Sequence, residues 1–455
     1  MKWNREKTLD LLNNLIKMSP ADETEVVFQA SDYGLTRYAG NVIHQNMSEQ
    51  DAIVSVRVAE GQKLGSAATN RLDEEGVSNT LKQALEMARM NEINPDFNGF
   101  AEKQKLEKVG GETFKPATAN TGPQERGDRA VNLLQYVRQA GFEAAGNISN
   151  GSYVSAVATS CGQTVYQQET RAQGSVVVNR PGKAGFGTGY AEWHGRDISE
   201  LGETKIASEA VAISAINKNA VSVDPGEYTV VLTPKAVGLL LYYLSWMSFH
   251  SRAVQSGQSF LTNRLGQQVL DEKLSIWDDG LDERNMAIPF DWEGMPKKRV
   301  DIITKGCAQG VVYDRFTAAK DQVFSTGHGL SPLRDRYYSS PLPTNLIMAT
   351  DDKTIQEMIA STKKGIYINS FWYVREVHFG KAVVTGMSRD GTFMIEDGKI
   401  SKALHNLRFT QSIMEAFRNV DMVGDTHQLT EQFNGFALIP ALKLRNFNIV
   451  GASPF

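Results

Sequence analysis

The sequence predicts an α+β fold, with an N-terminal α/β layer domain over residues 1–222 and a C-terminal, mainly antiparallel β domain over residues 223–455. Helical periodicity and strand-like alternation follow one another in the first half, whereas hairpin patterns dominate the second. At roughly 100–200 residues per domain, a chain of 455 residues suits two large domains or three small ones. The turn residues 224–226 (Asp-Pro-Gly) mark the candidate boundary.

Helices alternate with strands in the first half. Leucines at helical spacing predict a helix over residues 4–17, and a hairpin is predicted at 53–69 around the turn at Glu60-Gly61. The glycine-rich segment 180–189 lacks the ending of a phosphate-binding loop, so its glycines are expected in turns. The other predictions are helices over 73–90, 123–142 and 197–218, strands over 23–32, 153–159, 163–171 and 173–179, and a long loop over 91–122.

Antiparallel hairpins dominate the second half, together with two or three helices. A strand over 227–232 leads into a helix that Thr233 can cap, with Pro234 at its first position, where a missing N–H costs nothing. Further predictions are hairpins turning at Lys305-Gly306 and Asp397-Gly398, a short helix within 405–424, and strand-like segments over 436–451.

The charge balance argues against a protein dedicated to nucleic-acid binding. The formal net charge is -4, and the longest basic runs, 296–299 and 362–364, are interpreted as strand flanks and solvated faces. Cys161 and Cys307 are too far apart for a CxxC motif, and they are expected to be small buried residues in a reducing cytoplasm. The longest apolar run, 237–244, is far shorter than the roughly 20 residues that span a bilayer. With an amphipathic N-terminal helix instead of a signal peptide, the sequence predicts a cytoplasmic protein without a membrane partner.

Motifs for hydrolytic chemistry are absent from the sequence. No two of the seven histidines stand three, four or five residues apart, and no GxSxG elbow occurs. Asp278 and Asp279 fit a strand-ending turn better than a carboxylate pair, and Cys307 sits at a hairpin turn without an activating base. No catalytic or metal-binding residue is therefore assigned.

Two polar segments could bind a ligand. His328 lies between two glycines and could approach a ligand closely, or bond its own backbone. Arg408 precedes the short helix and could hold a carboxylate, or form an internal ion pair.

Several segments together resemble one known family. The segment from Thr36 to Arg89 is similar to the N-terminal domain of the TldD/PmbA family. The segments "GVVYDRFTAAK", "STGHG", "MSRDGTFMIEDGKI" and "NLRFTQSIMEAFRNVDMVG" resemble its C-terminal domain, in the expected order. The resemblance implies an α+β N-terminal domain and a C-terminal domain built on a curved antiparallel sheet.

The resemblance also implies a chemistry that this chain lacks the residues to perform. TldD-type members are zinc peptidases with an HExxxH helix and a late cysteine ligand, and they cut short or unfolded peptides, usually beside a TldE subunit. Here the corresponding helix reads "VGLLLYYLSWMSFH", and the late cysteine is missing. His250 stands beyond the motif position and receives no ligand role. Zinc is expected only in a TldD-type partner.

The first hypothesis is therefore a metal-free PmbA/TldE-like subunit that holds a peptide beside a TldD-type partner. Two alternatives stay open: a metallopeptidase with an unorthodox site at His250, His328 and His405, and a non-catalytic homodimer that binds peptides. Candidate groove residues are Tyr313, Arg315, His328 and Arg408. The gyrase-modulator label carried by the family finds no support in this composition, so no direct nucleic-acid partner is expected.

Overall fold

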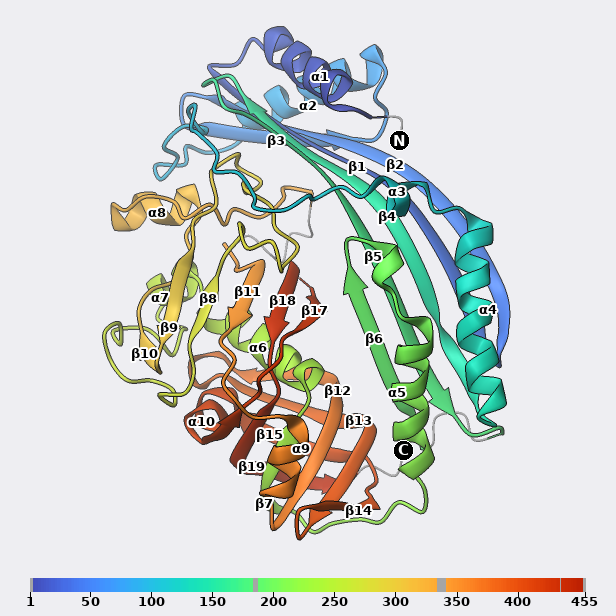
Figure 1. The fold of residues 1–455 in the computed structure, drawn as a ribbon. Coiled ribbons are helices and arrows are strands. Elements are labelled where there is room, and N and C mark those ends of the chain that lie inside the picture. Colours follow the sequence, from blue (N-terminus) through green and yellow to red (C-terminus); the bar gives the residue numbers. More distant parts are fainter. Residues whose placement is uncertain (1–2, 183–186, 334–340, 434, 453–455) are drawn as a thin grey trace.

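The computed structural model describes residues 3–182, 187–333, 341–433 and 435–452, and the strands within these ranges form three sheets (Figure 1). One sheet uses strands from the first 195 residues, and the other two use strands from residue 226 onward. The mixed α+β class is confirmed. The boundary predicted between residues 222 and 223 falls between a helix and a strand, and it stays a prediction.

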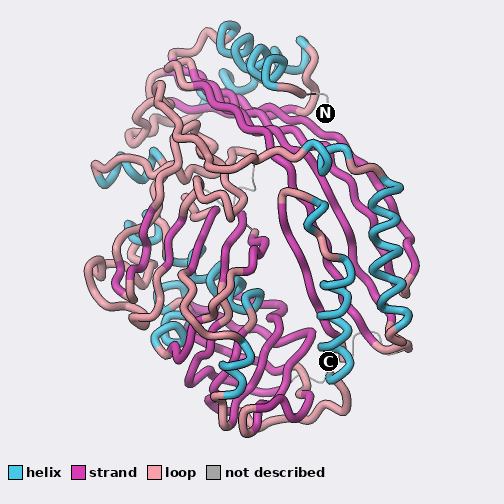
Figure 2. Tube along the Cα trace, viewed as in Figure 1, coloured by secondary structure: helices cyan, strands magenta, loops and turns pink. Residues whose placement is uncertain are grey.

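The first sheet is six-stranded, antiparallel and curved around the C-terminal half (Figures 1 and 2). Its order is β3-β2-β1-β4-β5-β6, with strands β1 (Glu23–Ala39), β2 (Val42–Glu60), β3 (Lys63–Thr69), β4 (Glu143–Thr159), β5 (Thr164–Asn179) and β6 (Gly189–Gly195). The strands predicted over 163–171 and 173–179 are one strand, because Gln173 pairs with β4 on one side and β6 on the other. Strand β6 was not predicted.

Helices cover one face of this sheet. Alternate residues of β1 explain why: Val26 and Phe28 pack under one pair of helices, whereas Val27 points the other way, toward Phe290 of the C-terminal half. The first-half helices are α1 (Arg5–Met18), α2 (Glu74–Met90), α3 (Pro116–Asn120), α4 (Pro123–Gln139), the 3-10 turn η1 (Ile198–Glu200) and α5 (Glu203–Ile216). The uncovered concave face is thus left to meet the C-terminal half. The predicted glycine-rich loop lies partly outside the described residues.

The second sheet is six-stranded, in the order β10-β9-β8-β11-β18-β17. Its strands are β8 (Ile276–Asp278), β9 (Val300–Thr304), β10 (Cys307–Ala308), β11 (Asn345–Met348), β17 (Gln428–Gln432) and β18 (Gly435–Ile439). Only β11 and β18 pair in parallel among its described strands. Strand β17 forms one edge.

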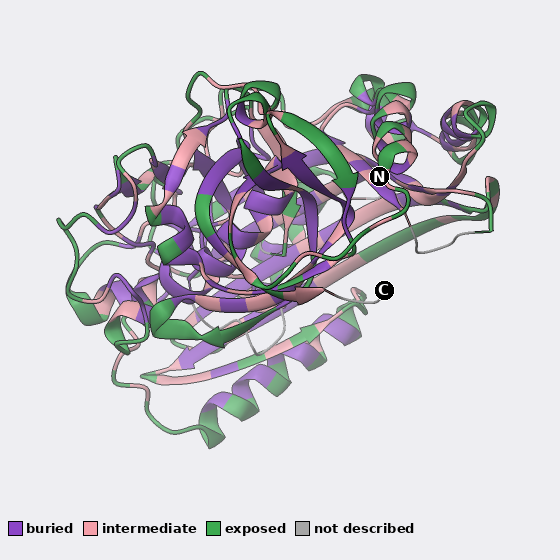
Figure 3. Ribbon diagram, turned by 90° about the horizontal axis from the view of Figure 1, so that it is seen from below, coloured by how far each residue is buried: buried purple, intermediate pink, exposed green. Residues whose placement is uncertain are grey.

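The third sheet closes on itself, because β12 pairs with both β7 and β13 at the two ends of the order β12-β7-β19-β15-β13. Its strands are β7 (Gly226–Leu232), β12 (Lys364–His378), β13 (Val383–Glu396), β14 (Lys399–Ala403), β15 (Leu407–Ser412), β16 (Val420–Val423) and β19 (Leu442–Ala452). β12 and β7 run parallel, so this half is mainly, not wholly, antiparallel. Figure 3 views the molecule from this side, where buried residues gather inside the ring.

Helix α6 (Pro234–Ser248) is the core element of the C-terminal half. Thr233 accepts the backbone N–H of Ala236, so the predicted cap is confirmed. Its leucines pack in one buried cluster with strands of both C-terminal sheets, and no described helix is long and apolar enough to cross a membrane. Short helices α7 (Ser251–Gln255), α8 (Arg315–Asp321), α9 (Ile355–Ala360) and α10 (Ile413–Arg418) and the 3-10 turn η2 (Phe379–Lys381) follow. The expected two or three helices were too few, because helices of five to seven residues carry little periodicity.

Candidate functional site

A cavity of about 420 Å³ lies between the concave face of the first sheet and the second sheet, and we call it the central cavity. The first sheet lines it with polar groups such as Gln29 and Arg171. The C-terminal half lines it with Phe433, Phe436 and Lys297 among others. A concave site with apolar walls and a few polar groups is the usual form of a ligand-binding site.

Strand β17 connects this cavity with a second one. Its last residues, Glu431 and Gln432, line the central cavity, and its first residues, Gln428 and Leu429, line a lateral cavity of about 650 Å³. Within the described chain, β18 is the only strand that pairs with β17. The other backbone edge of β17 is therefore unpaired in the described chain, and it runs from one cavity to the other.

The two halves are joined beside this edge by partly buried charges. Lys235, in the first turn of α6, contacts Glu192 of β6 at 2.6 Å. His194 lies 3.6 Å from Glu192 and 3.9 Å from Glu431. Burial opposes ionisation of Glu192, but His194 and Lys235 outweigh it and hold its pKa below the usual value. The edge of the first sheet is thereby fixed to the start of α6.

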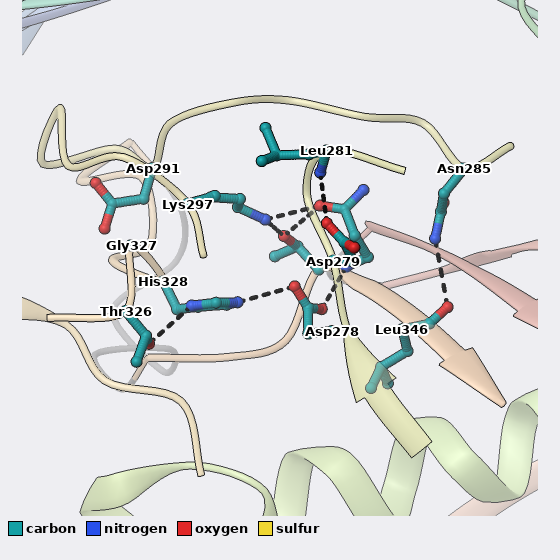
Figure 4. Close-up of polar contacts among 12 residues, drawn as sticks. Asp278, Asp279, Leu281, Asn285, Asp291, Lys297, Thr326, Gly327, His328 and Leu346 are labelled. Carbon is teal, nitrogen blue, oxygen red and sulfur yellow. Dashed lines mark hydrogen bonds and ion pairs between the residues drawn. The ribbon is translucent and has the colours of Figure 1, made fainter. Parts of the chain in front are cut away.

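A buried polar network supports the wall of the central cavity (Figure 4). Nε2 of His328 lies 2.8 Å from Oδ1 of Asp278, and Nδ1 lies 2.9 Å from the hydroxyl of Thr326. The backbone N–H of Asn345 donates to Oδ2 of Asp278 at 2.6 Å, and Nζ of Lys297 donates to Oδ1 of Asn345 at 2.7 Å. The network links β8, β11 and the loop around His328.

The charges of this network balance one another. Burial favours neutral Asp278, but Lys297, His328 and the N–H of Asn345 outweigh it and lower its pKa. Burial lowers the pKa of His328 despite the neighbouring carboxylate, so the imidazole is neutral near pH 7. A neutral ring with its proton on Nε2 donates to Asp278 and accepts from the Thr326 hydroxyl.

Asp278, His328 and Thr326 are linked in the same sequence of acid, imidazole and hydroxyl as a nucleophilic triad. The Thr326 hydroxyl, however, does not face a cavity where a substrate could bind. Thr326 also accepts the backbone N–H of Tyr313 at 2.7 Å, and it lines neither the central nor the lateral cavity. A nucleophile must reach a bound substrate. We therefore interpret this series as structural support for the wall.

The four predicted groove residues lie on different segments of the C-terminal half. Thr326 bridges the backbone of Tyr313 and the ring of His328, and Arg315 begins the adjacent helix α8. The Tyr313 hydroxyl donates to Asp321 at 2.9 Å, and burial with that carboxylate raises its pKa to about 12. Arg408 lies on β15 of the third sheet and does not line the central cavity.

Sequence reasoning missed most of the network. Lys297 belongs to a run interpreted as solvated, yet it is 5% exposed, and Asp278 was interpreted as a turn residue although it is 0% exposed. Asp279 does form the expected turn, since it accepts the N–H of Leu281 at 2.9 Å. The run "PKKR" offers no signal that separates the buried lysine from its exposed neighbour. Both cysteines were expected to be buried and are only partly so.

Comparison with known proteins identifies the family. Residues 225–451 match a sequence profile described as PmbA/TldA metallopeptidase C-terminal domain, and residues 24–88 match one described as PmbA/TldA metallopeptidase domain 1. The chain belongs to the PmbA/TldD metallopeptidase family.

Individual relatives agree with this assignment. A metalloprotease TldD homolog of Haemophilus influenzae is 30% identical over 49% of this chain, a match that spans only 46% of that relative. A TldD homolog of Buchnera aphidicola is 24% identical over 94% of this chain and 93% of its own length. Metalloprotease PmbA of Escherichia coli O157:H7 is 23% identical over 87% of this chain and 86% of its own length.

Solved structures share the fold. TldE from Thermococcus kodakarensis superimposes with a TM-score of 0.87 at 19% identity, covering 97% of this chain and all of that one. A Thermotoga maritima protein described as a candidate modulator of DNA gyrase gives a TM-score of 0.84 at 17% identity. The superposition covers 97% of this chain and all of that one.

The family description implies a metal, and the donor set of α6 does not fit one. Zinc takes nitrogen, sulfur or carboxylate ligands, whereas the buried side chains of α6 are mostly Leu, Tyr, Val and Met. His250 follows the helix, where its Nδ1 accepts the N–H of Ala253 and its Nε2 lies 3.0 Å from the Trp246 carbonyl. In the part of the chain that the structure describes, no three His, Cys, Asp or Glu residues gather as metal ligands. His250, His328 and His405 thus form no common site.

Proposed function

We propose that this chain is a metal-free, PmbA/TldE-like subunit of a TldD/TldE-type peptidase system, and that it holds an extended peptide for a TldD-type partner to cut. The observation that carries the proposal is the apolar interior of α6, at the place where the resemblance puts the HExxxH motif. The chain keeps the family scaffold, but this helix is packed as core.

The edge of β17 supports peptide binding. An extended peptide can add to an open strand edge through main-chain hydrogen bonds, which tolerate many sequences. The central and lateral cavities at the two ends of β17 provide space for alternate side chains. Beside the edge, Phe433 packs on Tyr242 of α6 with ring centroids 5.2 Å apart, which gives an apolar surface for one such side chain.

The subunit role is tested by co-expression with a TldD-type protein. We expect a stable complex, and cleavage of a short unstructured peptide that falls at least about tenfold when this chain is omitted. Zinc analysis of this chain alone should find no stoichiometric metal. Cleavage that is unchanged without this chain would contradict the subunit role, and chelator-sensitive cleavage by this chain alone would favour the unorthodox metallopeptidase.

Peptide addition at β17 is tested with N-methylated peptides. Successive residues of a strand direct their N–H groups to opposite sides, so methylation at residues of one parity should abolish binding and methylation at the other parity should be tolerated. Equal tolerance at both parities would contradict strand addition. Mass measurement with and without peptide separates this role from a homodimer that sequesters peptides.

A further inference from the structure

A third cavity, of about 690 Å³, lies between the first sheet and α8, and we call it the acidic cavity. Its wall includes the carboxylates of Glu25, Glu293 and Asp314. We propose that this cavity binds a primary ammonium group, either the N-terminus of a peptide or a lysine side chain. The inference rests on the proposed function only in taking a peptide as the natural source of the amine.

Each of the three carboxylates uses one oxygen to hold the protein together. Oε1 of Glu25 accepts Nε of Arg57 at 2.6 Å, and Oε2 of Glu293 accepts the backbone N–H of Arg315 at 2.8 Å. Oδ1 of Asp314 accepts the backbone N–H of Thr317 at 2.7 Å. These bonds fix the three groups around one space.

The second carboxylate oxygen of Glu25 lacks a hydrogen-bond donor. The Glu25 side chain is 1% exposed, and its Oε2 is buried without a hydrogen-bond partner in the described part of the chain. A buried acceptor without a donor is costly, and a charged acceptor more so. An ammonium group carries three donors and one positive charge, so it would supply the donor that Oε2 of Glu25 lacks.

Oε2 of Glu25 receives no hydrogen bond from an arginine of the cavity in the described part of the chain. Arg57 is engaged with Glu25, and Nη2 of Arg315 donates to the backbone carbonyls of Asn98, Gly99 and Phe100 at 2.9–3.2 Å. Nη1 of Arg315 lies 3.6 Å from the Met295 sulfur.

Burial and neighbouring carboxylates favour the neutral form of Glu293. Burial, Asp291 and Asp314 raise its pKa well above the usual value, against the opposing effects of Arg57 and the N–H of Arg315. Arg252 of α7 also lines the cavity. An ammonium group near Glu293 would favour its ionised form, so binding near neutral pH should release a proton.

The remaining wall suits the apolar part of such a ligand. Phe97, Phe100, Phe316 and Leu330 line the cavity beside the acids. The acidic cavity also shares Gly329, Leu330 and Ser331 with the central cavity. A peptide could therefore extend from one cavity into the next.

The test compares leucinamide with N-acetylleucinamide, because acetylation removes the ammonium group and keeps the side chain. Titration calorimetry of the full chain alone at pH 6.5 should show leucinamide binding at least about tenfold more tightly. Glu25→Gln and Glu293→Gln should each weaken leucinamide binding. Glu283→Gln, at an exposed glutamate outside the cavity wall, should not.

Proton release gives a second, independent measurement. The heat of binding in two buffers of different ionisation enthalpy should report proton release for the wild-type chain and less release for Glu293→Gln. Binding of N-acetyl-lysinamide would identify the lysine side chain as a source of the ammonium group. The proposal would be overturned if leucinamide failed to bind, or if it bound no better than N-acetylleucinamide. It would also be overturned if both glutamine variants bound leucinamide as tightly as the wild-type chain does. An N-acetylated peptide that still binds β17 would leave the proposed function standing.

Discussion

His328 donates from Nε2 to Oδ1 of Asp278 across 2.8 Å, although 50 residues separate the two and both side chains are fully buried. Lys297 and the N–H of Asn345 complete the surroundings of the carboxylate. A buried charge with compensating neighbours is tolerated, whereas removal of one partner leaves the others uncompensated. The wall of the central cavity depends on this balance.

Asp278→Asn should lower the free energy of unfolding by about 3 kcal/mol, because it removes the charge that most favours the ionised form of buried Lys297. Urea unfolding followed by fluorescence measures the change. Asp279→Asn is the matched control, since Asp279 is only partly buried and serves a turn, so a loss below about 1 kcal/mol is expected. Equal losses for the two variants would contradict the buried network.

His250 should make stability depend on pH. Burial lowers its pKa from the usual 6.5 to about 4, so between these values the unfolded chain takes up a proton that the folded chain refuses. Stability associated with neutral His250 is complete above pH 6.5 and is lost as the pH falls toward 4. The loss across this window should be on the order of 3 kcal/mol.

The variant His250→Asn keeps an acceptor for the N–H of Ala253 and removes the titration. Its unfolding free energy should therefore vary less between pH 6.5 and 4 than that of the wild-type chain. His378 caps the turn η2 in the same way but is exposed, so His378→Asn serves as the matched control variant. If the unfolding free energy of His250→Asn varied with pH as steeply as that of the wild-type chain, the pH dependence would come from other groups.

Local signals in the sequence were sufficient for some elements and not for others. Thr233 and Pro234 mark the start of α6 because capping depends on neighbours in sequence. The extent of β5 was missed because its continuity comes from pairing with two other strands. Burial of Lys297 depends on contacts with Thr344 and Asn345, nearly 50 residues away, which a local pattern does not contain.

The same reasoning applies to the candidate site. The absence of metal ligands in α6 could be read from its residues, because a helical motif is local. The acidic cavity could not, since Glu25, Glu293 and Asp314 come from three distant segments. Arg408 was selected from its position before a helix, and the fold places it in the third sheet.

The ion pair between Glu192 and Lys235 should contribute measurably to the docking of the two halves. The Glu192 side chain is 9% exposed and that of Lys235 is 31% exposed, and they lie 2.6 Å apart. A double-mutant cycle with Glu192→Ala and Lys235→Ala should give a coupling energy of about 1–3 kcal/mol in urea unfolding. The exposed pair Asp352–Lys353, at 3.0 Å, should give less than about 0.5 kcal/mol. Similar coupling in the two cycles would show that the pair between Glu192 and Lys235 does not strengthen the contact.

Phe433 should determine how tightly an apolar side chain binds beside β17. Phe433 is 71% exposed, it lines the central cavity, and its ring packs on Tyr242 with 5.2 Å between the centroids. Phe433→Ala removes apolar surface from the cavity wall, so affinity for an extended peptide should fall about tenfold while stability changes by less than about 1 kcal/mol. Fluorescence anisotropy of a labelled peptide measures the affinity. Phe324 is 88% exposed but lines neither cavity beside β17, so Phe324→Ala should bind like the wild-type chain, and equal losses in both variants would place the peptide elsewhere.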